Sequence, residues 1–148
     1  MRAPSRIKAL KWIFALYCIV MIWLLFLQRL GSMAPTGRYN LVPLDTVRLY
    51  IRLLQHSESL AQRNSAIANL AGNVVLFIPF GIFIPLMVSW QQKFLPFVIL
   101  TTGLLLLVEL LQYVTGLGAL DVDDMILNFC GVMIGRIFWR LLWKNKEQ

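Results

Sequence analysis

Carboxylate and amide side chains gather at the junction of two apolar stretches in the second half of the chain. They are Glu109, Gln112, Asp121, Asp124 and Asn128. A carboxylate can exchange protons with a substrate or help to hold a divalent cation, and an amide provides oriented hydrogen bonds. Because such groups are costly beside lipid-length apolar segments, we interpret them as the candidate functional site.

Composition indicates the environment in which these residues lie. The 148 residues are 59% hydrophobic and 14% charged, whereas about 25% charged residues is typical of soluble proteins. Mean hydropathy is +0.71. We therefore predict a single membrane domain over residues 1–148 that contacts membrane lipids. The net charge of +7 comes from basic residues flanking the apolar stretches, which favours a topology signal over a nucleic-acid partner.

Four apolar stretches are long enough to cross a bilayer as helices, at about residues 10–30, 67–90, 94–113 and 124–143. The sequence thus predicts an all-α membrane protein with both termini on one side. Lys and Arg are more numerous on that side, and the turn at 114–122 carries none. The positive-inside rule therefore predicts cytoplasmic termini in a plasma-membrane protein.

A short amphipathic helix is predicted between the first two spans. Apolar residues recur there at helical spacing, at Leu44, Val47, Tyr50, Ile51 and Leu54. Asp45 or Thr46 can cap its start. We expect the helix to lie in the membrane interface and cover the bundle. The alternative is that it holds Arg48 and Arg52 near lipid phosphates.

Small residues predict where the spans approach one another closely. Ala68 and Gly72 are four residues apart in the second span, which allows close helix contact. Gly131 and Gly135 repeat this spacing in the fourth span, and we interpret them as packing positions.

Polar residues on three predicted spans fall at one depth. Glu109 lies fifteen residues after Phe94, about 22 Å along a helix that rises about 1.5 Å per residue. That leaves it about 8 Å below the outer edge of a hydrocarbon core of about 30 Å. Asn73 and Asn128 lie about 9 Å and about 6 Å deep. The match predicts a shared polar pocket that opens outward.

We assign seven residues to this predicted ligand-binding pocket: Asn69, Asn73, Glu109, Gln112, Asp121, Asp124 and Asn128. Glu109 is the best candidate for a catalytic acid or base. The alternative for Glu109 is a structural lock, in which it hydrogen-bonds to Asn73 or Asn128. Asp123 points to another side of the helical wheel and is a weaker candidate. With His56 as the single histidine, we expect neither a metal site nor a cofactor.

Several segments resemble the VanZ-like family of small bacterial membrane proteins, which is named for a teicoplanin-resistance accessory protein. They are NLVPL from Asn40, NLAGNVVLFIPFG from Asn69, VELLQ from Val108, and DVDD from Asp121 with Asn128, Gly131 and Gly135. Together they cover about residues 40–140. The family has an arginine shortly before the first aspartate of the last motif, and this chain has GLGAL at 116–120 instead. Arg48 and Arg52 are the candidates to replace that arginine.

The resemblance implies a plasma-membrane protein that acts in glycopeptide resistance or cell-envelope physiology. Its partner would be a glycopeptide or a lipid-linked cell-wall precursor. Two other functions stay open from the residues. One is a membrane enzyme for a lipid-linked phosphate or ester, with Asp121 and Asp124 holding a cation. The other is a purely structural or interaction role. The sequence does not indicate an oligomeric state.

Overall fold

The computed structural model describes residues 4–27 and 39–143, which form five α-helices. The helices are α1 (Pro4–Leu25), α2 (Asp45–His56), α3 (Leu60–Met87), α4 (Phe94–Val114) and α5 (Val122–Leu142). A 3₁₀ turn, η2 (Ser89–Gln92), joins α3 to α4, and the strands β1 (Tyr39–Asn40) and β2 (Leu120–Asp121) pair in parallel. Four helices of this described part, α1, α3, α4 and α5, are long and apolar enough to cross a membrane. The predicted helical fold with four spans is confirmed.

The helix boundaries agree best with the predicted spans in α4 and α5, which begin and end within two residues of them. By contrast, α3 begins at Leu60, well before the predicted 67. The side chain of Ser59 caps this start by accepting the backbone N–H of Gln62, and α2 packs against α3. The helix therefore extends beyond its apolar stretch. The last part of the predicted first span, 28–30, lies outside the described residues.

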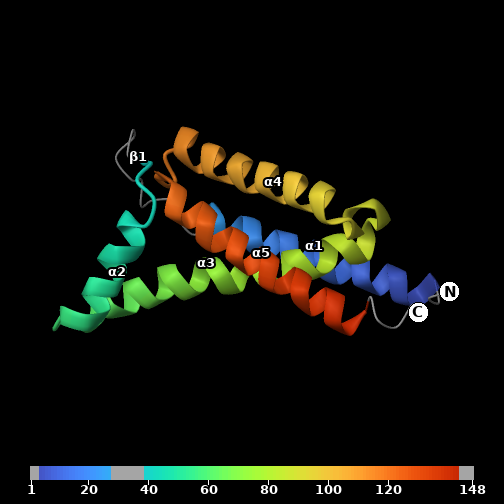
Figure 1. Ribbon diagram of the computed structural model, residues 1–148, viewed down its shortest axis with the longest axis horizontal. Coiled ribbons are helices and arrows are strands. Elements are labelled where there is room, and N and C mark those ends of the chain that lie inside the picture. The colour runs from blue at the N-terminus through green and yellow to red at the C-terminus, as the bar shows by residue number, and fades with distance from the viewer. Residues whose placement is uncertain (1–3, 28–38, 144–148) are drawn as a thin grey trace.

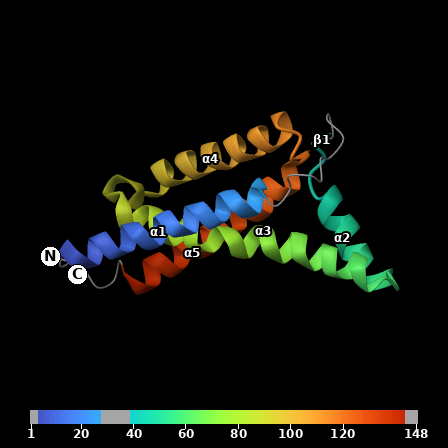
Figure 2. The same ribbon diagram turned by 180° about the vertical axis from the view of Figure 1, so that it is seen from behind.

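The four long helices lie alongside one another and define two ends of the molecule (Figures 1 and 2). At one end α3 and α5 begin, α4 ends, and α2 and the two strands are attached. We call it the carboxylate end, because it holds Glu109 and Asp121. At the other, η2 joins α3 to α4 beside the last turns of α5. We call it the cationic end, because it holds Lys93, Arg136 and Arg140. The cytoplasmic placement of the cationic end, like the interfacial position of α2, stays a prediction.

Glycines let α3 and α5 pack more closely than any residue with a side chain would allow. A Cβ atom at Gly131 would lie 2.1 Å from the carbonyl oxygen of Val74, and one at Gly135 would lie 2.0 Å from that of Ile78. From the other helix, a Cβ at Gly81 would lie 2.0 Å from the carbonyl oxygen of Val132. The predicted packing role of Gly131 and Gly135 is therefore confirmed.

The prediction of a close contact at Ala68 and Gly72 is wrong. Ala68 is exposed, and a Cβ at Gly72 would meet nothing within 4 Å in the described part of the chain. The α3 glycine that meets α5 is Gly81, about two and a half turns further along, and it lies against Val132 and Gly135. Spacing of four residues shows which small residues share a face, but only the packing shows which face meets a neighbour.

The first span is attached to this pair through aromatic and polar contacts. The hydroxyl of Tyr17 donates to the carbonyl oxygen of Leu76 at 2.7 Å. Phe14 lies against Phe80 and Phe83, with ring centroids 6.3 and 5.3 Å apart. Other faces of α1 are exposed, and Trp12 is 77% accessible. Exposed apolar faces of this kind are expected where lipid replaces water.

Arg136 closes the cationic end. Its guanidinium donates through Nη1 to the carbonyl oxygen of Gln91 at 3.0 Å and through Nη2 to that of Gln92 at 2.8 Å. The same group lies 4.2 Å from the ring centroid of Phe97, within range of a cation–π contact. Arg136 thus fixes η2, and with it the α3–α4 connection, to α5.

Candidate functional site

Asp121 joins the segment before α2 to the start of α5. It is the N-cap of α5 and accepts the backbone N–H of Asp123 on Oδ1 at 2.9 Å. The amide of Asn40 donates to the same oxygen at 3.1 Å, and the hydroxyl of Thr46 donates to Oδ2 at 2.7 Å. Asn40 also donates to Thr46 at 2.9 Å, which closes a triangle of side chains. The β1–β2 pairing sets Asn40 opposite Asp121 and so makes the triangle possible.

Asp123 provides the N-terminal cap that α2 lacks. The prediction that Asp45 or Thr46 caps this helix is wrong, because its N-cap is Leu44, with φ 67° and no side-chain cap of its own. The carboxylate of Asp123 instead accepts the backbone N–H of Leu44 at 2.6 Å and that of Val47 at 3.1 Å. A capping box satisfies these same two positions from within one segment. Here the acceptor comes from another helix, and it is fully buried.

Asn73 and Asp124 connect α3 to α5 within the predicted pocket. The side-chain amide of Asn73 donates to Oδ1 of Asp124. Both side chains are partly buried. The structure therefore brings together two residues of the predicted pocket, and the bond between them crosses the helix pair that the glycines hold close.

The two α4 candidates meet different neighbours. Glu109 is 2% exposed, and its Oε2 accepts the backbone N–H of Asp121 at 3.5 Å, so it lies against the start of α5. Gln112 donates through Nε2 to the carbonyl oxygen of Leu25 at 3.0 Å, which attaches the end of α1 to α4. Glu109 therefore belongs to the group around α5, whereas Gln112 acts as a brace for the first span.

The remaining two asparagines differ in the same way. Asn128 is 3% exposed, and its Oδ1 has no hydrogen-bond partner among the described residues. Asn69 donates to the carbonyl oxygen of Ser65 in its own helix at 3.0 Å. The hydrogen bond of Asn69 thus stays within α3, whereas Asn128 presents a buried acceptor that is still available.

Three residues of this network were not among the predicted site residues: Asn40, Thr46 and Asp123. Asn40 is the first residue of NLVPL, the first segment that resembles the VanZ-like family. This resemblance could have identified Asn40 from the sequence. Asp123 follows Asp121 by two positions at a helix start, where one carboxylate can cap its own helix and the other is free to cap a neighbour. The sequence could not show that the neighbour is α2, because 76 residues separate Val47 from Asp123.

The chemistry open to this end is mainly hydrogen bonding. Both carboxylate oxygens of Asp121 are occupied by donors, although the enzyme hypothesis needs them as cation ligands. Among the described residues, no group of three or more His, Cys, Asp or Glu side chains could hold a metal ion. Of the predicted site residues, Asn128 keeps a side-chain oxygen without a hydrogen-bond partner among the described residues.

The helices and the polar network together define the class of protein. Four apolar helices of bilayer length carry carboxylates and amides on inward positions, where a membrane protein keeps its polar groups. The chain is a multi-pass α-helical membrane protein.

Comparison with known proteins identifies the family. The VanZ/LLP1 family model matches residues 14–143, and the chain belongs to this family. Protein VanZ of Enterococcus faecium is 30% identical over 135 residues, which cover 90% of this chain and 75% of that protein. No solved structure matches the chain.

Proposed function

We propose that this protein is a cell-envelope accessory protein that lowers susceptibility to the glycopeptide teicoplanin by binding an envelope component at its carboxylate end. Family membership supports the general role. The observation that carries the binding part is the Oδ1 of Asn128, which is buried and unpartnered within the described chain. A buried acceptor without a hydrogen bond destabilises the fold by about 1–3 kcal/mol. If position 128 served packing alone, a side chain without such an acceptor would avoid this cost.

The hydrogen bonds of the predicted site residues show which of them hold the fold. Asp121, Asp123 and Gln112 hold backbone or side-chain groups that organise α1, α2 and α5. We assign the binding role to Asn128, together with the predicted site residues Asn73, Glu109 and Asp124, which also make hydrogen bonds within the fold. These side chains favour a ligand that presents N–H donors or an amine, because all four carry carboxylate or amide oxygens that can accept such bonds. Glycopeptides and peptide-bearing cell-wall precursors have such groups.

The test is the inhibitory concentration of teicoplanin and of vancomycin in a sensitive host that expresses the protein. We expect the wild-type chain to raise the teicoplanin value more than the vancomycin value. Asn128→Leu, which keeps side-chain size but removes the free acceptor, should abolish the increase while membrane protein levels stay unchanged.

The matched control is Asn69→Leu, because Asn69 bonds within its own helix. It should keep the wild-type increase. If wild type changes neither drug, the resistance role is wrong. If Asn128→Leu keeps full protection, the role can stand but binding at Asn128 does not.

A further inference from the structure

A cleft at the cationic end lies between η2, the first turn of α4 and the last two turns of α5. Its volume is about 620 Å³, and its lining includes Ser89, Lys93, Phe94, Trp139 and Arg140. Arg136 also borders it, but the guanidinium of Arg136 already donates to two backbone carbonyl oxygens of η2. The groups left for a ligand are therefore mainly Lys93, Arg140 and the hydroxyl of Ser89.

The charge around this cleft is not balanced within the described part of the chain. The described carboxylates lie in α2, just after it, or at the ends of α4 and α5 that form the carboxylate end. Lys93 and Arg140 are both exposed, and neither has a carboxylate partner among the described residues. Lys93 is also the N-cap of α4, whose first backbone N–H groups add partial positive charge. An anion of matching size would be attracted to this cleft.

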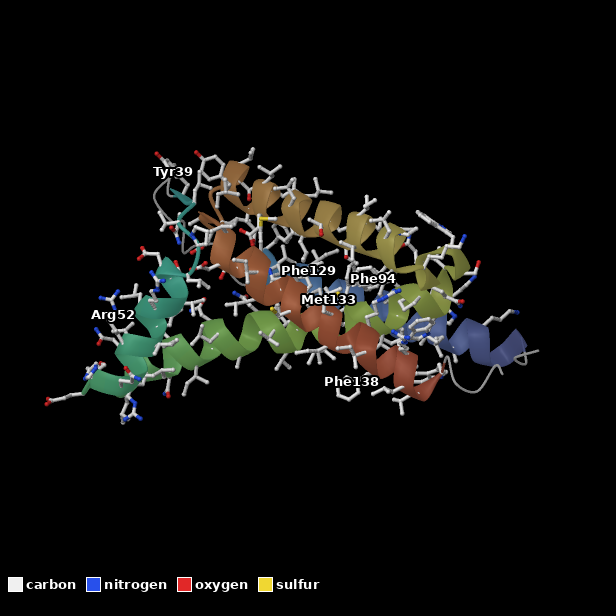
Figure 3. All side chains as sticks on the ribbon, viewed as in Figure 1. Tyr39, Arg52, Phe94, Phe129, Met133 and Phe138 are labelled. Carbon is white, nitrogen blue, oxygen red and sulfur yellow. The ribbon has the colours of Figure 1, made fainter. Side chains whose placement is uncertain are left out.

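Apolar side chains beside the cleft indicate what kind of anion fits. Leu95 and Leu141 are 66% and 61% exposed on the helices that flank it. Phe138, 47% exposed, projects outward from α5 (Figure 3). Trp139 and Phe94 line the cleft itself, and aromatic rings commonly mark the level of lipid headgroups. A ligand with an anionic head and apolar chains matches both surfaces.

We propose that this cleft binds the headgroup of an anionic phospholipid. The phosphate pairs with Lys93 and Arg140 and accepts a hydrogen bond from Ser89. The acyl chains lie along the exposed apolar side chains of α4 and α5. Basic clefts between transmembrane helices are the type of site that holds anionic headgroups.

The test uses the full-length protein in an uncharged detergent, titrated with phosphatidylglycerol or with phosphatidylcholine of the same acyl chains. Native mass spectrometry counts retained lipid, and thermal unfolding reports stabilisation. We expect retention and a higher Tm with phosphatidylglycerol only. The double variant Lys93→Gln with Arg140→Gln should weaken binding by about thirtyfold, since each cation contributes several-fold near an anionic lipid.

The matched control is Lys8→Gln with Lys11→Gln, which removes two exposed cations of α1 that do not line the cleft. It should bind as wild type does, and so should Lys93→Arg with Arg140→Lys, which keeps the charge and reports on folding. Equal weakening in the Lys8 and Lys11 variant would overturn the site, because the lipid would then follow overall charge. If inorganic phosphate alone raised the Tm as much as phosphatidylglycerol does, the lipid would be overturned as the ligand.

Discussion

The two ends of the bundle are closed by buried charges of opposite sign. At the carboxylate end, Asp123 accepts the N–H groups that begin α2. At the cationic end, Arg136 donates to the carbonyl oxygens of η2 that follow α3. A helix start leaves unpaired N–H groups and a helix end leaves unpaired carbonyl groups. The sign of each buried charge therefore follows from the backbone groups that it must satisfy.

Beyond these anchors, each end keeps polar groups that the described fold does not use. The carboxylate end retains the acceptor of Asn128, and the cationic end retains the exposed cations Lys93 and Arg140 and the buried side-chain amide of Gln91. The exposed cations suit the cationic end to anions, and no such pair of cations distinguishes the group around Asn128. The comparison separates residues that hold the fold from residues available for binding, and four substitutions test this separation.

The largest effect is expected at the contact between α3 and α5, the helices that link the two ends. Gly131→Leu places a side chain against the backbone of Val74, so α3 and α5 must separate. Overpacking of this kind costs about 1–3 kcal/mol or more, and we expect little folded protein by size-exclusion chromatography in detergent. Gly72→Leu is the control, because its site is open, and it should fold normally. Equal loss in both variants would contradict the role of the α3–α5 contact.

Asp123→Ala should release the carboxylate end alone. It leaves the N–H groups of Leu44 and Val47 without their acceptor, and hydrogen bonds to charged groups contribute about 1.5–3 kcal/mol. Faster amide exchange is expected in α2, while exchange at η2 stays unchanged. Asp45→Ala, an exposed acid in the first turn of α2, serves as the control and should have little effect. Unchanged α2 exchange in Asp123→Ala would contradict the cap.

Arg136→Lys should loosen the cationic end by a smaller amount. Lysine keeps the charge, but it lacks the planar fork that reaches the carbonyl oxygens of Gln91 and Gln92 together. Loss of one bond predicts a cost of about 1–2 kcal/mol, seen as faster exchange at residues 88–94 but not in α2. Arg140→Lys is the control. The same exchange change in both variants would show that Arg136 has no special part in holding η2.

Gln112→Leu is expected to have the smallest effect. It removes one hydrogen bond to the carbonyl oxygen of Leu25, which is worth about 1 kcal/mol. Exchange should rise near the end of α1, and teicoplanin susceptibility should stay at the wild-type value. A loss of protection at normal protein level would instead return Gln112 to the ligand-binding group.

Depth in the membrane was the basis of the predicted site. It placed Asn73 at one level with Glu109 and Asn128, and in the structure the side chain of Asn73 donates to Asp124 in the first turn of α5. Depth could not show that Asp121 and Gln112 are engaged by Thr46 and Leu25, because depth carries no information about which side chains of neighbouring segments face each other.

The arginines of α2 illustrate the same limit. The sequence offered Arg52 as a replacement for the family arginine that is missing before Asp121. In the structure Arg52 projects away from the bundle (Figure 3), and its Nε donates to the carbonyl oxygen of Arg48 in the same helix. Arg52 therefore does not point toward Asp121. The rotation of α2 about its own axis decides this direction.

The sequence by itself determined the four apolar helices of bilayer length and the family, because hydropathy and motifs are local properties. Only the tertiary structure decided which face of α3 carries the close contact, Gly81 and not Gly72, and which acid caps α2. Both depend on how helices far apart in the chain are rotated and placed against each other. Spacing along one helix does not contain that information.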